Sequence, residues 1–462
     1  MDQGHYLDLL HRVFAGRKVV LAAPLLADPA PIADILRSIG VDRPLIIAAG
    51  RPAGEARTVE QGECVTIDVQ APDYDTGIRV TEQALGDPPR HVMEAVDRYD
   101  PDGHALAIGT MFTTGPTIAR RPVYGVRRPE WAALEDKITV DPVWDAAGVP
   151  RPPSAVVPAS REGLWAAHRR LDRGLGTAWA GDAKEGFNSC ASYLRWIRRP
   201  DDAAEAVTFF EQHCDLVRVT PFLEGIPCSI HGMVLPEDVL AFRPVEMLTL
   251  RPPGNRLHYV ALATYWDPPD DERDAMRDVA RRVGAFLRER MGYRGAFTID
   301  GVMSEEGFRP TELNARWGSG LNSVTAGLEF PLWLLDKAVV AGEPLDYRAL
   351  DLEAMVVESA DANRGGGAHA WSDQELSGLR EEYSMADEGG RYRLLGEGEE
   401  AEVDGWLRPG SSILGDFLRF TPAPGRVEPG PPFAPRAVAA LDLADRELGT
   451  SFGHLEAARP VR

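Results

Sequence analysis

The segment that most constrains the fold of this chain is Ile299–Arg316, with the sequence IDGVMSEEGFRPTELNAR. Two stretches suited to extended structure flank a tight turn, which predicts a β-hairpin. If the hairpin turns at Glu306, Asp300 lies directly opposite Glu312, and the two Cβ atoms are about 4.5–5.5 Å apart. The sequence therefore predicts a sheet that presents two carboxylates side by side on one face.

Two further polar side chains follow on the second strand of this hairpin. Asn314 and Arg316 come two and four residues after Glu312, so strand alternation places all three on the same face. Pro310 is expected opposite Val302, and it requires an edge strand or a bulge there because proline cannot donate to a ladder. Such a bulge would shift the register by one residue. Carboxylate and amide oxygens suit Mg²⁺ together with substrate phosphates, and the arginine suits a phosphate oxygen. The competing interpretation is a solvated hairpin whose acids only keep it soluble.

Length and charge limit what the rest of the chain does. The 462 residues suggest about three domains. A net charge of −21 disfavours binding to nucleic acid or to an anionic membrane surface. No apolar run is long enough for a membrane helix, and no secretory signal opens the chain, so the cytoplasm is the expected location. Only four of the basic residues are lysines, which marks each of them as a place where an ammonium is needed, unless coding bias left them at random: Lys18, Lys137, Lys184 and Lys337.

Short apolar runs alternate with helical patterns in the first part of the chain, which predicts an α/β domain with a parallel sheet over residues 1–128. No GxGxxG motif follows the first run, so a dinucleotide site is not expected there. The expected strands are Lys18–Pro24, Pro44–Ala49, Cys64–Val69, His104–Gly109 and Val123–Val126.

Residues 129–348 show many strands and fewer helices, which predicts α+β subdomains with antiparallel sheets. An amphipathic helix is expected over Trp131–Gly148, where GVPRPP ends it. Residues 349–462 are expected to form a small C-terminal domain. It contains an acidic loop or hairpin edge at Gly396–Gly405, a proline-rich stretch at Thr421–Arg436 and a final helix at Ala437–Leu448.

Three segments in order resemble the ATP-grasp superfamily and together cover about residues 130–345. EDKITVDPVWDAAGVPRPPS resembles the helix that opens the fold, RVTPFLEGIPCSIHGMVL resembles the hinge strand beside adenine, and TELNARWGSGLN resembles the metal-binding strand E-x-N-x-R. The run FLEGIPCSIHGMV followed by FRPVEMLTLR is similar to the branch of peptide ligases with a pre-ATP-grasp domain, as in pheganomycin biosynthesis.

This resemblance implies an α/β N-terminal domain, an ATP-grasp fold whose two subdomains grip ATP, and a small C-terminal domain. It implies an ATP-dependent, ADP-forming ligase that activates an amino-acid-like carboxylate as an acyl phosphate and joins it to an amine, a peptide N-terminus in the closest branch. ATP and Mg²⁺, or Mn²⁺, would be the cofactors, and a homodimer is one assembly to test. Carboxylation, cyclising ligation and a non-catalytic nucleotide-binding module are the alternatives.

The resemblance also assigns roles to individual residues. The position of the usual second phosphate lysine, in the strand Thr177–Lys184, corresponds to Asp182 or its neighbours, so Lys184 is the only ammonium there. Glu246 and Arg243 are as well explained by structural salt bridges, and the lid by a plain turn. The expected roles are phosphate binding for Lys137 and Lys184; a lid for Gly186, Asn188 and Ser189; the adenine hinge for Phe222, Leu223 and Glu224; the ATP or metal shell for Glu246; metal binding for Asp300, Glu312 and Asn314; oxyanion or phosphate stabilisation for Arg316; a substrate carboxylate for Arg243; and acyl-phosphate contacts for Gly318, Ser319 and Gly320.

Overall fold

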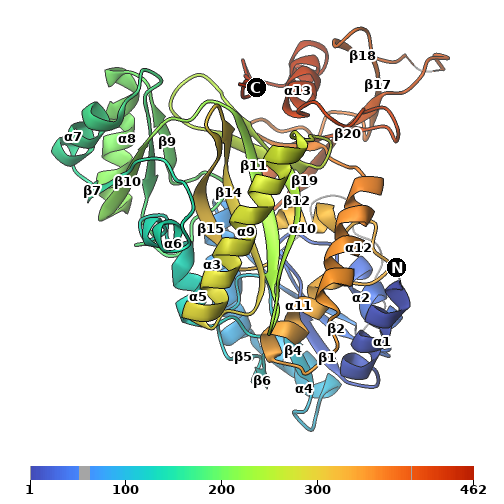
Figure 1. Cartoon of the computed structure of the whole chain (residues 1–462). Coiled ribbons are helices and arrows are strands. Elements are labelled where there is room, and N and C mark those ends of the chain that lie inside the picture. Colours follow the sequence, from blue (N-terminus) through green and yellow to red (C-terminus); the bar gives the residue numbers. More distant parts are fainter. Residues whose placement is uncertain (1, 51–62, 397, 462) are drawn as a thin grey trace.

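The structure of the chain is a computed structural model that describes residues 2–50, 63–396 and 398–461 (Figure 1). Within these described ranges, four sheets of four or five strands form the framework, and a two-stranded ribbon accompanies the first of them. Within the described residues, none of the helices combines the length and the apolar character that crossing a membrane requires.

The N-terminal sheet is parallel, with strand order β3-β2-β1-β4, as the alternation of strands and helices predicts. The two central strands, β1 and β2, are buried and apolar, which suits a sheet covered by helices on both faces. The predicted strand at Val123–Val126 is reduced to a single bridge between Ala107 and Val123. The elements of this unit are α1 (Gln3–Phe14), β1 (Val19–Ala22), α2 (Pro29–Ser38), β2 (Leu45–Ala49), β3 (Cys64–Ile67), α3 (Tyr74–Gly86), α4 (Arg90–Tyr99), β4 (Leu106–Ile108), β5 (Thr117–Ile118) and β6 (Arg121–Pro122).

The predicted helix over Trp131–Gly148 is wrong, because the structure breaks it into short pieces. These are α5 (Pro129–Ala132), one 3₁₀ turn, and α6 (Asp141–Ala146). Pro142 explains the break, since proline lacks an N–H and its ring clashes with the preceding turn of a helix. Lys137 lies in the interruption between these pieces.

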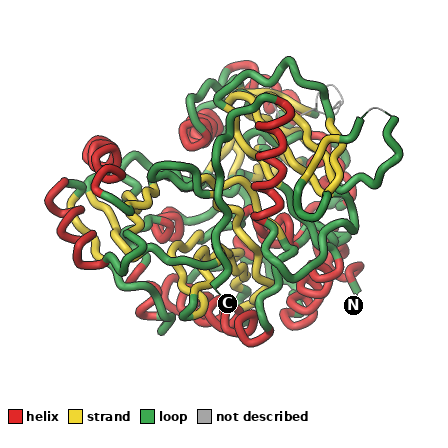
Figure 2. Tube along the Cα trace, turned by 90° about the horizontal axis from the view of Figure 1, so that it is seen from above, coloured by secondary structure: helices red, strands yellow, loops and turns green. Residues whose placement is uncertain are grey.

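A small antiparallel sheet projects from the molecule with strand order β7-β10-β8-β9, and we call this unit the lid sheet (Figures 1 and 2). Its inner face packs with α7 and α8 into a core of its own. The elements are β7 (Ala155–Pro158), α7 (Arg161–Leu171), β8 (Thr177–Gly181), β9 (Leu194–Ile197), α8 (Pro200–His213) and β10 (Leu216–Pro221).

A five-stranded antiparallel sheet with order β13-β12-β11-β14-β15 follows, and we call it the central sheet. Helix α9 covers one face, while α10, α11 and α12 belong to the core on the other face, which also includes α1 and part of the N-terminal sheet. The elements are β11 (Ile226–Val234), β12 (Val239–Leu250), β13 (His258–Ala263), α9 (Asp270–Met291), β14 (Gly295–Ser304), β15 (Gly307–Asn314), α10 (Ser319–Val324), α11 (Leu332–Ala341) and α12 (Ala349–Ala362).

The C-terminal unit contains a third antiparallel sheet, with order β16-β20-β19-β17-β18, packed against α13. Because α12 lies in the core shared with α10 and α11, this unit begins after Ala362 rather than at residue 349. Its elements are β16 (Ala368–Ser372), β17 (Tyr383–Asp387), β18 (Tyr392–Leu394), β19 (Gly405–Ser412), β20 (Gly415–Pro422) and α13 (Ala434–Leu448).

Candidate active site

The hairpin formed by β14 and β15 has the register that its sequence predicts at the two carboxylates. Asp300 pairs with Glu312, and the pairing shifts between Asp300 and Gly301. Pro310 therefore lies opposite Gly301 rather than Val302, because the bulge absorbs one residue next to the proline. β15 is an edge strand, as the missing N–H of proline requires.

Asp300 lies at the centre of a polar cluster on the central sheet. Its carboxylate accepts hydrogen bonds from Oγ of Ser229 at 2.5 Å and from the amide nitrogen of Asn314 at 2.9 Å. Burial, and next the nearby charge of Glu312, raise the pKa of Asp300. Two acids held this closely favour a bound cation, because a cation relieves their mutual repulsion.

Lys137 reaches this cluster from the broken helix. Its ammonium lies 3.4 Å from Oε1 of Glu312 and donates a 2.8 Å hydrogen bond to Oδ1 of Asn188. The neighbouring Asp136 accepts a hydrogen bond from the N–H of Ile138, which stabilises the turn. The structure thus brings the lysine predicted to contact phosphate beside the predicted metal ligands.

Arg316 lies on the other side of Asn314. It donates to Oδ1 of Asn314 at 2.7 Å, and its Nε lies 3.1 Å from Oε2 of Glu135. The guanidinium also stacks over the rings of Phe112 and Phe187. The sequence analysis missed Glu135, which nothing in its local pattern distinguishes from a surface acid.

The loop after β8, residues 182–192, closes over the cluster and docks on the N-terminal unit. Asp75 at the start of α3 accepts hydrogen bonds from N–H and Oγ of Ser189 and from Oγ of Ser192. Gly186 adopts a left-handed backbone at φ +94°, which favours glycine. The predicted lid residues Gly186, Asn188 and Ser189 therefore lie in one loop, and Asn188 and Ser189 contact the residues around the cluster. Asp75, far away in sequence, was missed.

Lys184 does not lie in the cluster. Its exposed ammonium pairs with Asp215 at 2.7 Å on the lid sheet. Asp182 is buried and accepts hydrogen bonds from the N–H groups of Asp215 and Leu216, so it ties the loop to β10. Neither residue offers a cation to a phosphate, and the prediction for Lys184 is not supported by its position.

Arg218 is a buried cation on β10 of the lid sheet. It pairs in register with Ala180. Its guanidinium binds Asp141 at 2.6 Å and donates to the carbonyl of Thr311 on β15 at 3.2 Å. Arg218 therefore connects the lid sheet to the central sheet, a role that the sequence alone did not indicate.

Residues 222–225 join the lid sheet to the central sheet, which is the position expected of a hinge. Phe222 stacks on Trp196 with ring centroids 3.9 Å apart, and its N–H donates to Gly176. Among the described residues, neither backbone polar group of Leu223 has a hydrogen-bond partner. Glu224 binds Arg251 through two hydrogen bonds of 2.9 and 2.7 Å.

Glu246 lies outside the cluster. It pairs with Cys228 on β11, whereas Asp300 pairs with Ser229, the next residue along that strand. Successive residues of a strand point to opposite faces, so Glu246 and Asp300 lie on opposite faces of the central sheet. The Glu246 carboxylate accepts the N–H groups of Phe433 and Ala434 at the start of α13, at 2.6 and 3.0 Å. Its assignment to the ATP or metal shell is therefore wrong.

Arg243 is occupied by carboxylates of the chain itself. It is buried, its Nε lies 3.0 Å from Asp361, and it also binds Asp267. A hydrogen bond of 2.6 Å to the carbonyl of Thr264 completes the contacts. The prediction that Arg243 binds a substrate carboxylate is therefore not supported.

Gly318, Ser319 and Gly320 form the start of α10, beside the hairpin. A Cβ at Gly318 would collide with Thr298, and a Cβ at Gly320 would collide with the ring of His231. The two glycines thus let α10 approach the central sheet, on the face that carries the cluster. Burial lowers the pKa of His231 to about 3, so its ring is neutral.

The donor set at the hairpin fits Mg²⁺ bound together with a nucleotide. Asp300 and Glu312 supply carboxylate oxygens, while the amide oxygen of Asn314 already accepts from Arg316. Within the described ranges, no three His, Cys, Asp or Glu side chains gather into a metal-binding group. Two carboxylates suffice for Mg²⁺, because phosphate oxygens and water complete its octahedron.

Comparisons with known proteins support this architecture. No protein-family model and no curated protein matches the chain. Solved structures do match. Biotin carboxylase from Campylobacter jejuni in its β-γ-ATP complex aligns with a TM-score of 0.54 at 11% identity, over 96% of this chain and 92% of that one.

Two further structures cover similar spans. N5-carboxyaminoimidazole synthase from Aspergillus clavatus, in complex with ADP and its ribonucleotide, gives a TM-score of 0.51 at 10% identity, over 94% of this chain and 100% of that one. The biotin carboxylase domain dimer of 2-oxoglutarate carboxylase from Hydrogenobacter thermophilus was solved with MgADP and bicarbonate. It gives a TM-score of 0.50 at 13% identity, over 96% of this chain and 91% of that one. The chain therefore shares the fold of these structures over nearly its whole length, and this fold consists of an α/β unit, an ATP-grasp fold and a small sheet after it.

Proposed function

We propose that the chain is an ADP-forming ligase that joins a carboxylate to an amine through an acyl phosphate. The observation that carries this proposal is the pair Asp300 and Glu312, opposed in one hairpin between Lys137 and Arg316. Phosphoryl transfer depends mainly on positioning and on neutralising charge, which two acids for a metal ion and two flanking cations provide.

In this proposal the substrate carboxylate attacks the γ-phosphorus of ATP, the bond to the bridging oxygen breaks, and ADP leaves. The amine then attacks the acyl carbon, the carbon–oxygen bond to phosphate breaks, and phosphate and a proton leave. Mg²⁺ held by Asp300 and Glu312, or Mn²⁺ in its place, would neutralise the β- and γ-phosphates. Lys137 contacts the γ-phosphate, and Arg316 stabilises the oxyanion. The 182–192 loop excludes water from the acyl phosphate.

Phe222, Leu223 and Glu224 would receive the adenine. Leu223 offers an N–H and a carbonyl that the described chain leaves unpaired. The Trp196 and Phe222 rings supply an apolar wall beside them, and Arg251 lies over both rings, 5.3 and 5.1 Å from their centroids. Gly318, Ser319 and Gly320 would contact the acyl phosphate from the start of α10.

The finer proposal is that the acid is amino-acid-like and that the amine is the N-terminus of a peptide, as in the branch that FLEGIPCSIHGMV resembles. Carboxylation is the second candidate, because the structures described above are carboxylases or a synthase that bind ATP or ADP. A non-catalytic nucleotide-binding module is the alternative outside catalysis.

Hydroxylamine in place of the amine tests the proposal. Pooled organic acids with ATP and Mg²⁺ should release ADP and form a hydroxamate that requires one of the acids. ADP release that requires bicarbonate instead would favour carboxylation. Nucleotide binding without any turnover would favour the non-catalytic module.

A further inference from the structure

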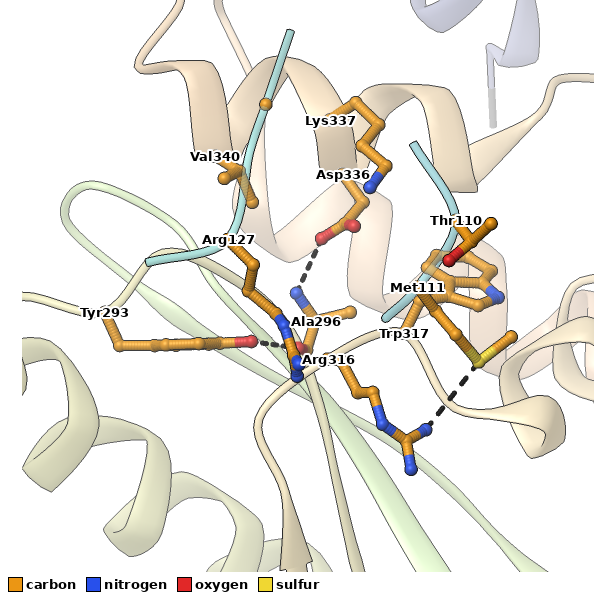
Figure 3. A pocket seen from close by; sticks show the side chains of 11 residues that line it. Thr110, Met111, Arg127, Tyr293, Ala296, Arg316, Trp317, Asp336, Lys337 and Val340 are labelled. Atoms are coloured by element: carbon orange, nitrogen blue, oxygen red, sulfur yellow. Dashed lines mark hydrogen bonds between the residues drawn. The ribbon is translucent and has the colours of Figure 1, made fainter. Parts of the chain in front are cut away.

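A small pocket lies beside Arg316, where the N-terminal unit meets the central sheet and α11 (Figure 3). Three cationic side chains from separate segments line it: Arg127, Arg316 and Lys337. Figure 3 shows that they come from the loop after the N-terminal sheet, from the chain after β15, and from α11, and that the guanidinium of Arg316 points toward the sulfur of Met111, away from Lys337.

Lys337 has no anionic partner at contact distance. Within the described part of the chain, its ammonium makes neither a hydrogen bond nor an ion pair, whereas Lys137 lies 3.4 Å from Glu312 and Lys184 lies 2.7 Å from Asp215. Burial lowers the pKa of Lys337. An ammonium that lines a pocket without a partner leaves its charge for a bound anion.

The other charges of the pocket do not satisfy this ammonium. Arg127 and Arg316 share one carboxylate, that of Glu135. Asp336 lines the pocket, but its Oδ1 accepts the N–H of Ala296 at 2.6 Å. Glu82 also lies near Lys337 and Arg127, so the three cations share three carboxylates, but within the described residues none of these carboxylates contacts the ammonium of Lys337.

The position of Lys337 is fixed by packing. Gly125 has a left-handed backbone at φ +62°, and a Cβ there would collide with the carbonyl of Lys337. The N-terminal unit thus lies directly against this turn of α11. This close approach fixes the backbone of Lys337 at the junction of the two units.

We propose that Lys337 and Arg127 hold a substrate carboxylate other than the one that is phosphorylated. This inference rests on the proposed ligase function and deepens it. Arg316 lines the pocket and also bonds to Asn314 of the cluster, so one bound substrate reaches from the reacting centre to Lys337. The carboxylate belongs either to the activated acid, as a second acidic group, or to an acceptor amino acid, as its free carboxyl group.

Chemical labelling tests the pocket without any turnover. The intact protein is acetylated with sulfosuccinimidyl acetate, and its four lysines are followed by peptide mass spectrometry. The acetylation rate of each lysine is measured in the presence of three acids, namely glutarate, glutamate and alanine. It is measured again with the matching amides, which are glutaramide, glutamine amide and alaninamide. At least one of the acids should slow acetylation of Lys337 about fivefold at four times its Kd, while its amide counterpart has no effect. Lys18 and Lys184 are the internal controls, and their labelling should not change.

Equal labelling of Lys337 with and without every acid would overturn the proposal. Protection by bicarbonate alone would also overturn it, since the pocket would then serve carboxylation. Because this assay needs neither ADP formation nor an amine, a failure of the ligase proposal leaves its result interpretable.

Kinetics identify which substrate carries the carboxylate. Lys337→Met should raise the KM of one organic substrate about tenfold, with kcat and the KM of ATP within about twofold. If the KM of the acid rises in Lys337→Met even when hydroxylamine is the amine, the bound carboxylate belongs to the activated acid. If a KM rises only when an amino acid is the acceptor, the bound carboxylate belongs to the acceptor. Lys337→Arg should restore most of the affinity, and Lys184→Met is the matched control. Unchanged KM values for both substrates in Lys337→Met would contradict the proposal.

Discussion

The central sheet and the lid sheet contribute to the candidate site in different ways. The central sheet supplies Asp300 and Glu312 from one hairpin, where neighbouring residues of the sequence fix their geometry. At the corresponding part of the lid sheet, Lys184 points to Asp215 and Arg218 is bound to Asp141. The two acids and Arg316 are thus placed locally by one hairpin segment, whereas Lys137 comes from a distant segment of the chain.

The lysine of the cluster comes from a segment that only the tertiary structure brings to the hairpin. Lys137 lies in a break between short helices, and the loop over it is fastened by Asp75 of the N-terminal unit. The comparison teaches that the lid sheet acts here through its loop and its hinge rather than through cations of its strands.

Loss of an acid from the central sheet should have the largest effect. Asp300→Asn keeps the shape and the hydrogen bond with Ser229 but removes a negative charge from the metal site. We expect the rate of ADP formation to fall by about 10³-fold or more. Circular dichroism and thermal unfolding should show an unchanged fold. A variant with more than a tenth of the wild-type rate would contradict the role of Asp300.

Removing single lysines compares the cluster with the lid sheet directly. Lys137→Met should raise the KM of ATP about 10- to 100-fold, because a cation beside the phosphates is lost. Lys184→Met should change it by less than about twofold, since that ammonium is exposed and paired with Asp215. Initial rates at varied ATP measure both values. Equal effects of the two substitutions would remove the distinction between the sheets.

Loss of the hydrogen bonds that hold the 182–192 loop on the N-terminal unit should have a smaller effect on nucleotide binding. Asp75→Ala removes the acceptor of three hydrogen bonds from Ser189 and Ser192. We expect residues 182–192 to be cleaved faster by protease, and nucleotide affinity to fall about three- to tenfold. The control Asp87→Ala, exposed at the far end of α3, should behave as the wild type does. Unchanged cleavage in Asp75→Ala would show that the loop is held by other contacts.

Glu246 should affect stability and not catalysis. Burial raises its pKa from 4.5 to about 7, so the folded chain binds more protons than the unfolded chain between these values. The free energy of unfolding should therefore fall as pH rises from about 4.5 to 7, by about 3 kcal/mol from this group, and stay level above. In Glu246→Gln this fall disappears.

Denaturant unfolding at pH 5 and pH 8 measures the difference between wild type and Glu246→Gln. The exposed Glu381→Gln serves as the control and should keep the wild-type pH dependence. ADP formation should remain near normal in Glu246→Gln. A loss of activity with unchanged stability would return Glu246 to the active site.

The sequence predicted the parts of the fold and site that depend on short-range patterns. The parallel sheet, the antiparallel strands and the opposition of Asp300 and Glu312 follow from periodicity and from one turn. The helix over Trp131–Gly148 failed because an apolar period continues through Pro142, where a helix cannot.

The remaining errors come from information that no local pattern contains. The face on which Glu246 lies depends on its strand register and on α13, almost 190 residues later. Arg243 finds Asp361 on α12, and Asp75 finds Ser189 on the loop, only after the units assemble. The pocket around Lys337 likewise needs Arg127 and α11 to meet.

The central claim is that Asp300 and Glu312 hold the metal of a magnesium nucleotide. Calorimetric titration of a non-hydrolysable ATP analogue, with and without Mg²⁺, tests it in the wild type and in Glu312→Ala. The account predicts that Mg²⁺ tightens binding about tenfold or more in the wild type and less than about twofold in the variant. An equal gain from Mg²⁺ in both proteins would contradict it.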